Sequence, residues 1–310
     1  MLRLSEIERP EEIIEMSALD RGSLWHEILE DFIGESTPGQ LHAFDDPDYR
    51  WTDDDRARLF AHAARRFSEY ENLGRTGRGI LWAIRAEETT ADLDGFLESD
   101  NEMRTDKRGT PHDVEMRFGL RAPEGERSTV AAEITLDDGR VIRLGGLIDR
   151  VDMRNDGVPV ILDYKTGKIR TKEGQRQLDA DPVLGGRKLQ LGAYAQAAKQ
   201  HFETSTAEAY YWHTSAKGEF KRIGYPWTQD RHERFVEVVG TIVDGIERGD
   251  FPPNPGDYSA HHGTFANCAY CPFDDVCPVD RDEEYEQAVK SGRLVDYVLM
   301  QEPPEADEES

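Results

Sequence analysis

The feature that most constrains this chain is a pair of β-strands joined by a short polar turn. Residues 141–151 and 158–165 both have the β-branched and aliphatic composition of strands. Between them lie Asn155, Asp156 and Gly157, residue types that tolerate positive φ angles and therefore favour a hairpin turn. We expect an antiparallel hairpin in which residues near position 149 lie beside residues near position 163.

Two carboxylates and a lysine would meet on this hairpin. Residues two apart on a strand point to the same face, so Asp163 and Lys165 project together while Tyr164 faces away. Asp149 would bring a second carboxylate close to Asp163. Two such groups repel unless a cation lies between them, and Mg²⁺ or Mn²⁺ with oxygen ligands is the usual solution. With a lysine to orient a water, this is the chemistry of phosphodiester hydrolysis.

The alternative is a solvated surface ion pair, which is the usual interpretation of an isolated Asp-x-Lys. Here, however, the apolar run at residues 160–162 indicates a strand that is buried on both faces before it reaches the charges. Charged groups at the end of a buried strand are costly unless they have partners, and this favours a functional site.

The G-x-x-D pattern ending at Asp149 and the D-Y-K-T-G run starting at Asp163 resemble the active site of the PD-(D/E)XK nuclease superfamily, specifically its RecB-like branch. The resemblance implies an α/β fold, with a restriction-endonuclease-like mixed sheet core flanked by helices. It also implies that Asp149, Asp163 and the backbone carbonyl of Tyr164 bind Mg²⁺ or Mn²⁺, while Lys165 orients the attacking water.

Two weaker motifs lie ahead of the hairpin. Apolar side chains at helical spacing predict a helix over residues 19–33. On it, Gly22 and His26 match the G-x-x-x-H element whose histidine joins the metal site in RecB-like nucleases. Alternating residues at 111–121 predict a strand with one polar face, and Glu115 on it matches the family's assisting acid. Without the resemblance, His26 would be interpreted as a packed or surface residue and Glu115 as solvated.

A third motif follows the hairpin. Gln190 and Tyr194 are four residues apart on a helix predicted at residues 188–202, and so share one helical face. They match the family's Q-x-x-x-Y element, which positions DNA. The loop between the strand and this helix is rich in basic residues, which favours contact with phosphates, although a solvated loop is the alternative. These residues are Lys168, Arg170, Lys172, Arg176, Arg187 and Lys188.

We expect four regions in the 310 residues. Residues 1–108 form an N-terminal helical region that carries the His motif, with a long helix at 53–72 and a helix pair at 80–103. Residues 109–250 form the nuclease core, and residues 251–302 form a C-terminal region with a cysteine loop. Residues 303–310 are acidic and are predicted to be a disordered tail.

The three cysteines, Cys268, Cys271 and Cys277, form one short cluster. An odd, clustered set in a chain of cytosolic character argues for metal binding rather than disulfides. Structural zinc is the physical default, with His261 or His262 as the fourth ligand. The resemblance to AddB-type nucleases implies instead a [4Fe–4S] cluster, whose remaining cysteine lies upstream. This sequence has no upstream cysteine, so the fourth cluster ligand is not identified.

The chain has 63 acidic and 38 basic residues, a formal net charge of −25. Acidic residues are spread throughout and arginine is commoner than lysine, which indicates a surface adapted to high salt and a halophilic source. The first residues contain no signal-peptide core, and no run of about 18 apolar residues occurs. We therefore expect a cytoplasmic protein without membrane contact.

The sequence lacks the G-x-x-x-x-G-K-[ST] pattern of a nucleotide-binding loop, so the chain carries no ATP motor. We predict a Mg²⁺- or Mn²⁺-dependent deoxyribonuclease, an exonuclease of DNA repair and recombination that works with a helicase partner. One alternative is a non-catalytic DNA-binding or scaffold module of a helicase–nuclease complex. Another is a zinc-stabilised nuclease that acts on RNA.

Overall fold

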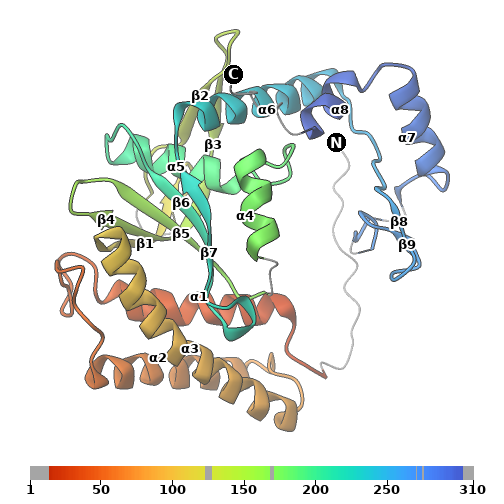
Figure 1. Ribbon diagram of the computed structural model, residues 1–310. Coiled ribbons are helices and arrows are strands. Elements are labelled where there is room, and N and C mark those ends of the chain that lie inside the picture. Colours follow the sequence, from red (N-terminus) through yellow and green to blue (C-terminus); the bar gives the residue numbers. More distant parts are fainter. Residues whose placement is uncertain (1–13, 123–127, 168–170, 270, 274–275, 303–310) are drawn as a thin grey trace.

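A five-stranded sheet forms the centre of the protein (Figure 1). The computed structural model describes residues 14–122, 128–167, 171–269, 271–273 and 276–302. The strand order is β1-β4-β5-β6-β7, in which β5 and β6 run parallel and the other neighbours antiparallel. The strands are β1 (Gly109–Phe118), β4 (Gly146–Arg154), β5 (Pro159–Lys165), β6 (Glu208–His213) and β7 (Arg222–Pro226). The predicted mixed sheet and the β4–β5 hairpin are confirmed.

One face of the sheet is covered by α1 (Ala18–Gly34), α2 (Asp53–Asn72) and α3 (Gly79–Lys107) (Figure 1). Val160, Leu162 and Tyr164 of β5 pack into the apolar core that these helices form. The predicted helix pair at residues 80–103 is wrong, because α3 is one continuous helix. Nothing interrupts it: the segment has no proline, and the ring of Phe220 packs directly on Gly95.

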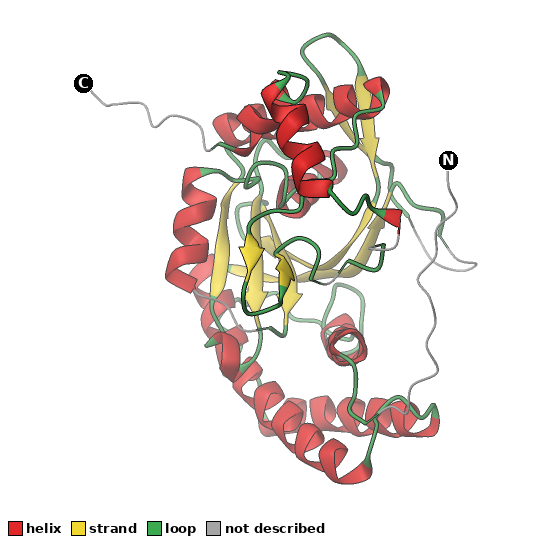
Figure 2. Cartoon of the chain, turned by 90° about the vertical axis from the view of Figure 1, so that its right-hand side faces the viewer, coloured by secondary structure: helices red, strands yellow, loops and turns green. Residues whose placement is uncertain are grey.

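The opposite face carries α4 (Thr171–Ala180), α5 (Gln190–His201) and α6 (Gln229–Arg248), with the hairpin of β2 (Ala132–Thr135) and β3 (Val141–Leu144) (Figure 1). Figure 2 shows helices on both sides of the sheet. The predicted single strand at 141–151 is broken at Gly145, where the chain leaves the β2–β3 ladder and enters the central sheet. Part of the predicted basic loop is the helix α4. Its Gln175 side chain exchanges two hydrogen bonds of 3.0 Å with the backbone of Gly224 in β7.

The alternation of side chains between the two faces of the sheet is interrupted in the middle of strand β1. Glu115 has a φ of 48°, in the left-handed region that non-glycine residues rarely adopt. Val114 consequently packs against the α1–α3 core, whereas Met116 belongs to the core on the other face. The predicted strict alternation through residue 115 is therefore wrong. Such backbone strain costs ~1–3 kcal/mol and is concentrated at functional sites.

Buried charges join the helical layer to the sheet. The Arg150 guanidinium of β4 lies 2.6 Å from Asp100 of α3 and 2.5 Å from Asp152 on its own strand. Asp100 also accepts a hydrogen bond of 2.7 Å from Arg104. All four side chains are fully buried. Because every charge has a partner, the network fixes α3 on the sheet.

The C-terminal part of the chain contains β8 (Tyr258–Ser259), β9 (Thr264–Phe265), α7 (Arg281–Lys290) and α8 (Val295–Gln301), and a short 3₁₀ turn, η1 (Ala216–Gly218), precedes β7. None of the helices within the described ranges is long and apolar enough to cross a membrane. The predicted tail at 303–310 lies outside the described residues, and the division of the chain into regions stays a prediction.

Candidate active site

Asp149 lies at the junction of three elements. One of its carboxylate oxygens, Oδ2, accepts a hydrogen bond of 2.7 Å from the backbone N–H of Tyr164 in β5. The other, Oδ1, is 3.3 Å from Nδ1 of His26, which α1 carries to the end of the sheet. Nε2 of the same imidazole lies 3.3 Å from the carbonyl oxygen of Tyr164. His26 and the Tyr164 carbonyl, both predicted at the site, therefore lie next to Asp149.

Three potential metal ligands converge here. One ligand atom each from His26, Glu115 and Asp149 lie within 4.8 Å of one another. They come from α1, β1 and β4, and they offer one imidazole nitrogen and two carboxylate oxygens. This donor set suits Mn²⁺ or Mg²⁺, so the residues present fit a divalent metal. Glu115, predicted to assist, is itself a member of the group.

Asp163 and Lys165 lie at the edge of this group. The Asp163 side chain is only 2% exposed, and its carboxylate forms an ion pair with the Lys165 ammonium group. Burial and the negative charge of Asp149 raise the pKa of Asp163 to about 6, although Lys165 opposes the rise. The two carboxylates predicted to face each other across the hairpin therefore do influence one another.

Burial and mutual repulsion disfavour the charged forms of the carboxyl groups in this site. Burial, followed by the charges of Asp149 and Glu30, raises the pKa of Glu115 to about 8. Burial lowers the pKa of His26, but its hydrogen bond to Asp149 and the surrounding carboxylates outweigh this and raise it above 6.5. Both shifts show that the cavity favours added positive charge, which a proton or a metal ion supplies.

Gln190 and Tyr194 line the approach to Lys165. The Lys165 ammonium group donates to Oε1 of Gln190 at 3.5 Å, and Nε2 of Gln190 donates to the Tyr194 hydroxyl at 3.0 Å. Gly146 makes this approach possible, since an added Cβ would lie 2.8 Å from the Phe118 ring and 3.2 Å from the Tyr194 ring. The motif predicted from four-residue spacing is thus joined to the lysine.

Sequence reasoning missed two residues close to this centre, Glu30 and Tyr211. The negative charge of Glu30 helps to raise the pKa of Glu115. Its position one helical turn after His26 could have identified Glu30 as a residue of the site. Tyr211 of β6 pairs with Asp163 in the parallel ladder, and Lys188 lies over its ring. No sequence signal identified Tyr211, because the β5–β6 pairing is long-range.

The structure describes only some of the basic residues predicted to form a loop after β5. Arg176, Arg187 and Lys188 are exposed. Lys168 and Arg170 lie outside the described residues, as does the side chain of Lys172.

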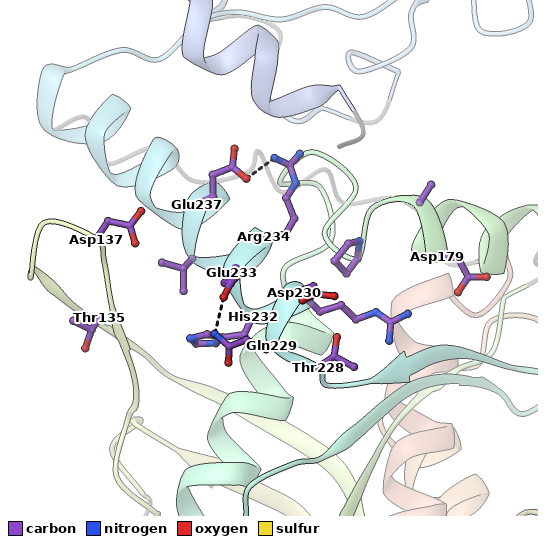
Figure 3. Close-up of a pocket in the computed structure, with 14 residues that line it drawn as sticks. Thr135, Asp137, Asp179, Thr228, Gln229, Asp230, His232, Glu233, Arg234 and Glu237 are labelled. Atoms are coloured by element: carbon purple, nitrogen blue, oxygen red, sulfur yellow. Dashed lines mark hydrogen bonds and ion pairs between the residues drawn. The ribbon is translucent and has the colours of Figure 1, made fainter. Parts of the chain in front are cut away.

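A cavity of about 980 Å³ lies elsewhere, between the start of α6, α4 and the β2–β3 hairpin (Figure 3). Two pairs of its polar residues contact each other. Gln229 donates to Glu233 at 2.9 Å, and Arg234 lies 3.0 Å from Glu237. This cavity shares no residue with the carboxylate site.

The cysteine loop does not form a ready-made ligand set. Cys268 and Cys277 are half-buried and Cys271 is exposed, and all three are free thiols. Among the described residues, none of their sulfur atoms belongs to a group of three or more potential ligands within 4.8 Å. Arg281 donates to Cys268 Sγ at 3.6 Å. The chain supplies three cysteines, one fewer than a four-cysteine cluster requires.

The family model of the PD-(D/E)XK nuclease superfamily matches residues 2–278. The chain therefore belongs to this superfamily, and this membership indicates a metal-dependent nuclease. No curated protein matches the chain. A solved structure titled "Crystal structure of SSO0001" is similar over 84% of this chain and 97% of that one, at 16% identity and a TM-score of 0.30.

Proposed function

We propose that this protein is a Mg²⁺- or Mn²⁺-dependent deoxyribonuclease, an exonuclease that works with a helicase in DNA repair and recombination. The observation that carries the proposal is the convergence of His26, Glu115 and Asp149 beside the Asp163–Lys165 pair. Membership of the superfamily supports phosphodiester hydrolysis, and the resemblance of the motifs to RecB-like nucleases supports DNA as substrate.

In the proposed mechanism His26, Glu115 and Asp149 would hold the metal, with Asp163 and the Tyr164 carbonyl beside them. The bound ion supplies Lewis acidity toward the scissile phosphate. Asp163 and Gln190 fix the Lys165 ammonium group, which orients the attacking water. The water oxygen forms a bond to phosphorus and loses a proton to solvent, the phosphorus–oxygen ester bond breaks, and the leaving oxygen takes up a proton from solvent. Gln190 and Tyr194 position the strand.

The test is cleavage of end-labelled single- and double-stranded DNA with Mg²⁺ or Mn²⁺ at high KCl, comparing the wild type with Lys165→Ala and Asp163→Ala. Lys290→Ala is the matched control, because Lys290 is also an ion-paired lysine but lies on the exposed face of α7. We expect the first two variants to lose activity and the control to keep it. Equal activity in all four proteins would refute the assignment.

Substrate competition addresses the finer parts of the proposal. Linear DNA should be degraded and a covalently closed circle of the same sequence should not, if the enzyme is an exonuclease. Preferential cleavage of RNA would favour the zinc-stabilised alternative. Absence of cleavage with DNA and RNA, with retained DNA binding, would favour the scaffold module.

The role of the cysteine loop stays a prediction. Iron, sulfide and zinc quantification on anaerobically purified protein tests it directly. Stoichiometric iron and sulfide lost in Cys271→Ser would support a cluster with one non-cysteine ligand. Stoichiometric zinc would favour the structural zinc site.

A further inference from the structure

A second cavity, of about 450 Å³, opens beside Lys165 between α4 and the central sheet. Its floor is apolar and is formed by buried Leu178, Tyr211 and Ile223. Its rim is polar and includes Lys165, Glu173, Gln177 and Lys188. A cavity with an apolar floor and a polar rim fits a flat ligand that has apolar faces and hydrogen-bonding edges.

The sheet register places this cavity next to the catalytic groups. Asp163 pairs with Tyr211, and Lys165 with His213, in the parallel β5–β6 ladder. Directly paired residues project from the same face, so the wall of the cavity continues the row of Asp163 and Lys165. The Lys165 Nζ lies 5.2 Å from the centroid of the Tyr211 ring. An occupant would therefore lie next to the phosphate that Lys165 serves.

The cavity wall contains unused hydrogen-bonding groups. Tyr211 is 5% exposed, and within the described part of the chain its hydroxyl has no hydrogen-bond partner. His213 donates from Nδ1 to the Gly167 carbonyl at 3.0 Å, which leaves Nε2 as an acceptor. Burial lowers the pKa of His213, so its ring is neutral at neutral pH. Together with the Gln177 amide, these groups can meet the edge of a nucleobase.

Lys188 adds a positive charge at the rim, which the carboxylate of Glu173 also lines. Its Nζ lies 5.6 Å from the Tyr211 ring centroid, and it has no carboxylate partner among the residues that the structure describes. In a chain with a net charge of −25, an unpaired lysine beside a catalytic lysine is well placed to contact a phosphate.

We propose that this cavity binds an unpaired nucleobase of the nucleotide next to the scissile phosphate, with Lys188 on a neighbouring phosphate. This inference rests on the proposed nuclease function and deepens it, because it assigns single-stranded DNA as the preferred substrate. A base inside a duplex is paired and stacked, and it reaches such a cavity only after it is flipped out.

The first test removes the base and leaves the backbone. Single-stranded oligonucleotides carrying one abasic residue at successive positions around a cleaved bond are digested with the wild-type protein. We expect kcat/KM to fall about tenfold at one defined position and little at the others, since base stacking on protein side chains has effects of this size. The corresponding duplex should be cleaved more slowly than the single strand.

The second test fills the cavity. Gly174 of α4 lines the cavity, so Gly174→Leu places an aliphatic side chain there. The substitution also favours the helix, because glycine destabilises a helix interior. Gly245→Leu in α6 is the matched control, because an added Cβ at Gly245 meets nothing closer than the Asp250 carbonyl at 3.9 Å. Gly174→Leu should lose about tenfold in kcat/KM on the intact strand and become insensitive to the abasic residue, whereas the control should behave as wild type.

A binding readout separates this inference from the proposed function. With EDTA present, each protein is added to a single strand that carries 2-aminopurine at the sensitive position. If nothing is cleaved, the 2-aminopurine is placed at each position of the strand in turn. A fluorescence change with wild type and Gly245→Leu, but not with Gly174→Leu, supports the base site. Cleavage that ignores the abasic residue at every position, a preference for duplex, or identical fluorescence with all three proteins would overturn it. Absence of cleavage with the fluorescence difference intact would refute only the nuclease assignment.

Discussion

Glu115→Gln should stabilise the metal-free protein and abolish its activity. The folded-state pKa of Glu115 is about 8, against an ordinary value of 4.5, because of burial and the charges of Asp149 and Glu30. The folded state therefore binds more protons than the unfolded state between these values. Stability contributed by the protonated carboxyl is full below pH 4.5 and is lost as the pH rises through 8.

The displacement from 4.5 to about 8 corresponds to ~5 kcal/mol at full ionisation. The carboxyl is only half-buried, and water screens its repulsion, so we expect less than half of this figure, ~2 kcal/mol. Glutamine has the same shape and no charge. In EDTA at pH 9 the variant should therefore melt roughly 3 °C above the wild type, and at pH 4.5 the two should melt together.

The assay is a series of melting curves from pH 4.5 to 9, in EDTA and in Mg²⁺ or Mn²⁺, with nuclease activity measured in parallel. Glu87→Gln, a charge loss at an exposed position of α3, is the control and should show no pH-dependent gain. Metal should raise the Tm of the wild type and not that of Glu115→Gln. A variant that is less stable than the wild type at every pH would show that Glu115 is not held under repulsion, and the reasoning would fail.

Three further predictions concern the fold, the lysine and the surface. Asp100→Asn removes a buried charge partner of Arg150 and should lower the free energy of unfolding in urea by ~3–5 kcal/mol. Glu98→Gln, in an exposed pair on the same helix, should lower it by less than about 1 kcal/mol, and equal losses would contradict the prediction. Gln190→Leu removes a contact of Lys165 and should lower kcat about tenfold without changing the Tm; unchanged kcat would exclude the positioning role. Because screening relieves the repulsion within a net charge of −25, the Tm should rise steadily with KCl up to molar concentrations, and a flat series would rule out adaptation to salt.

Local patterns predicted the elements that lie along one stretch of chain. The helices α1 and α2 and the strand β5 follow from apolar spacing, and Asn155-Asp-Gly157 specified the β4–β5 hairpin. The errors came where long-range packing overrides local signals. The helix α4 is held to β7 by hydrogen bonds between Gln175 and Gly224, and α3 continues through Gly95, on which the distant ring of Phe220 packs. Neither contact leaves a trace in the neighbouring sequence.

The sequence by itself placed three groups of the candidate site together, because Asp149, Asp163 and Lys165 lie on one hairpin whose register is set by its own turn. Only the tertiary structure decided which groups could share a metal. His26 and Glu115 reach Asp149 through the packing of α1 on the sheet and through the left-handed backbone at residue 115, and Tyr211 reaches Lys165 through a parallel pairing. These contacts join residues far apart in the chain, and their geometry depends on the whole core rather than on local periodicity.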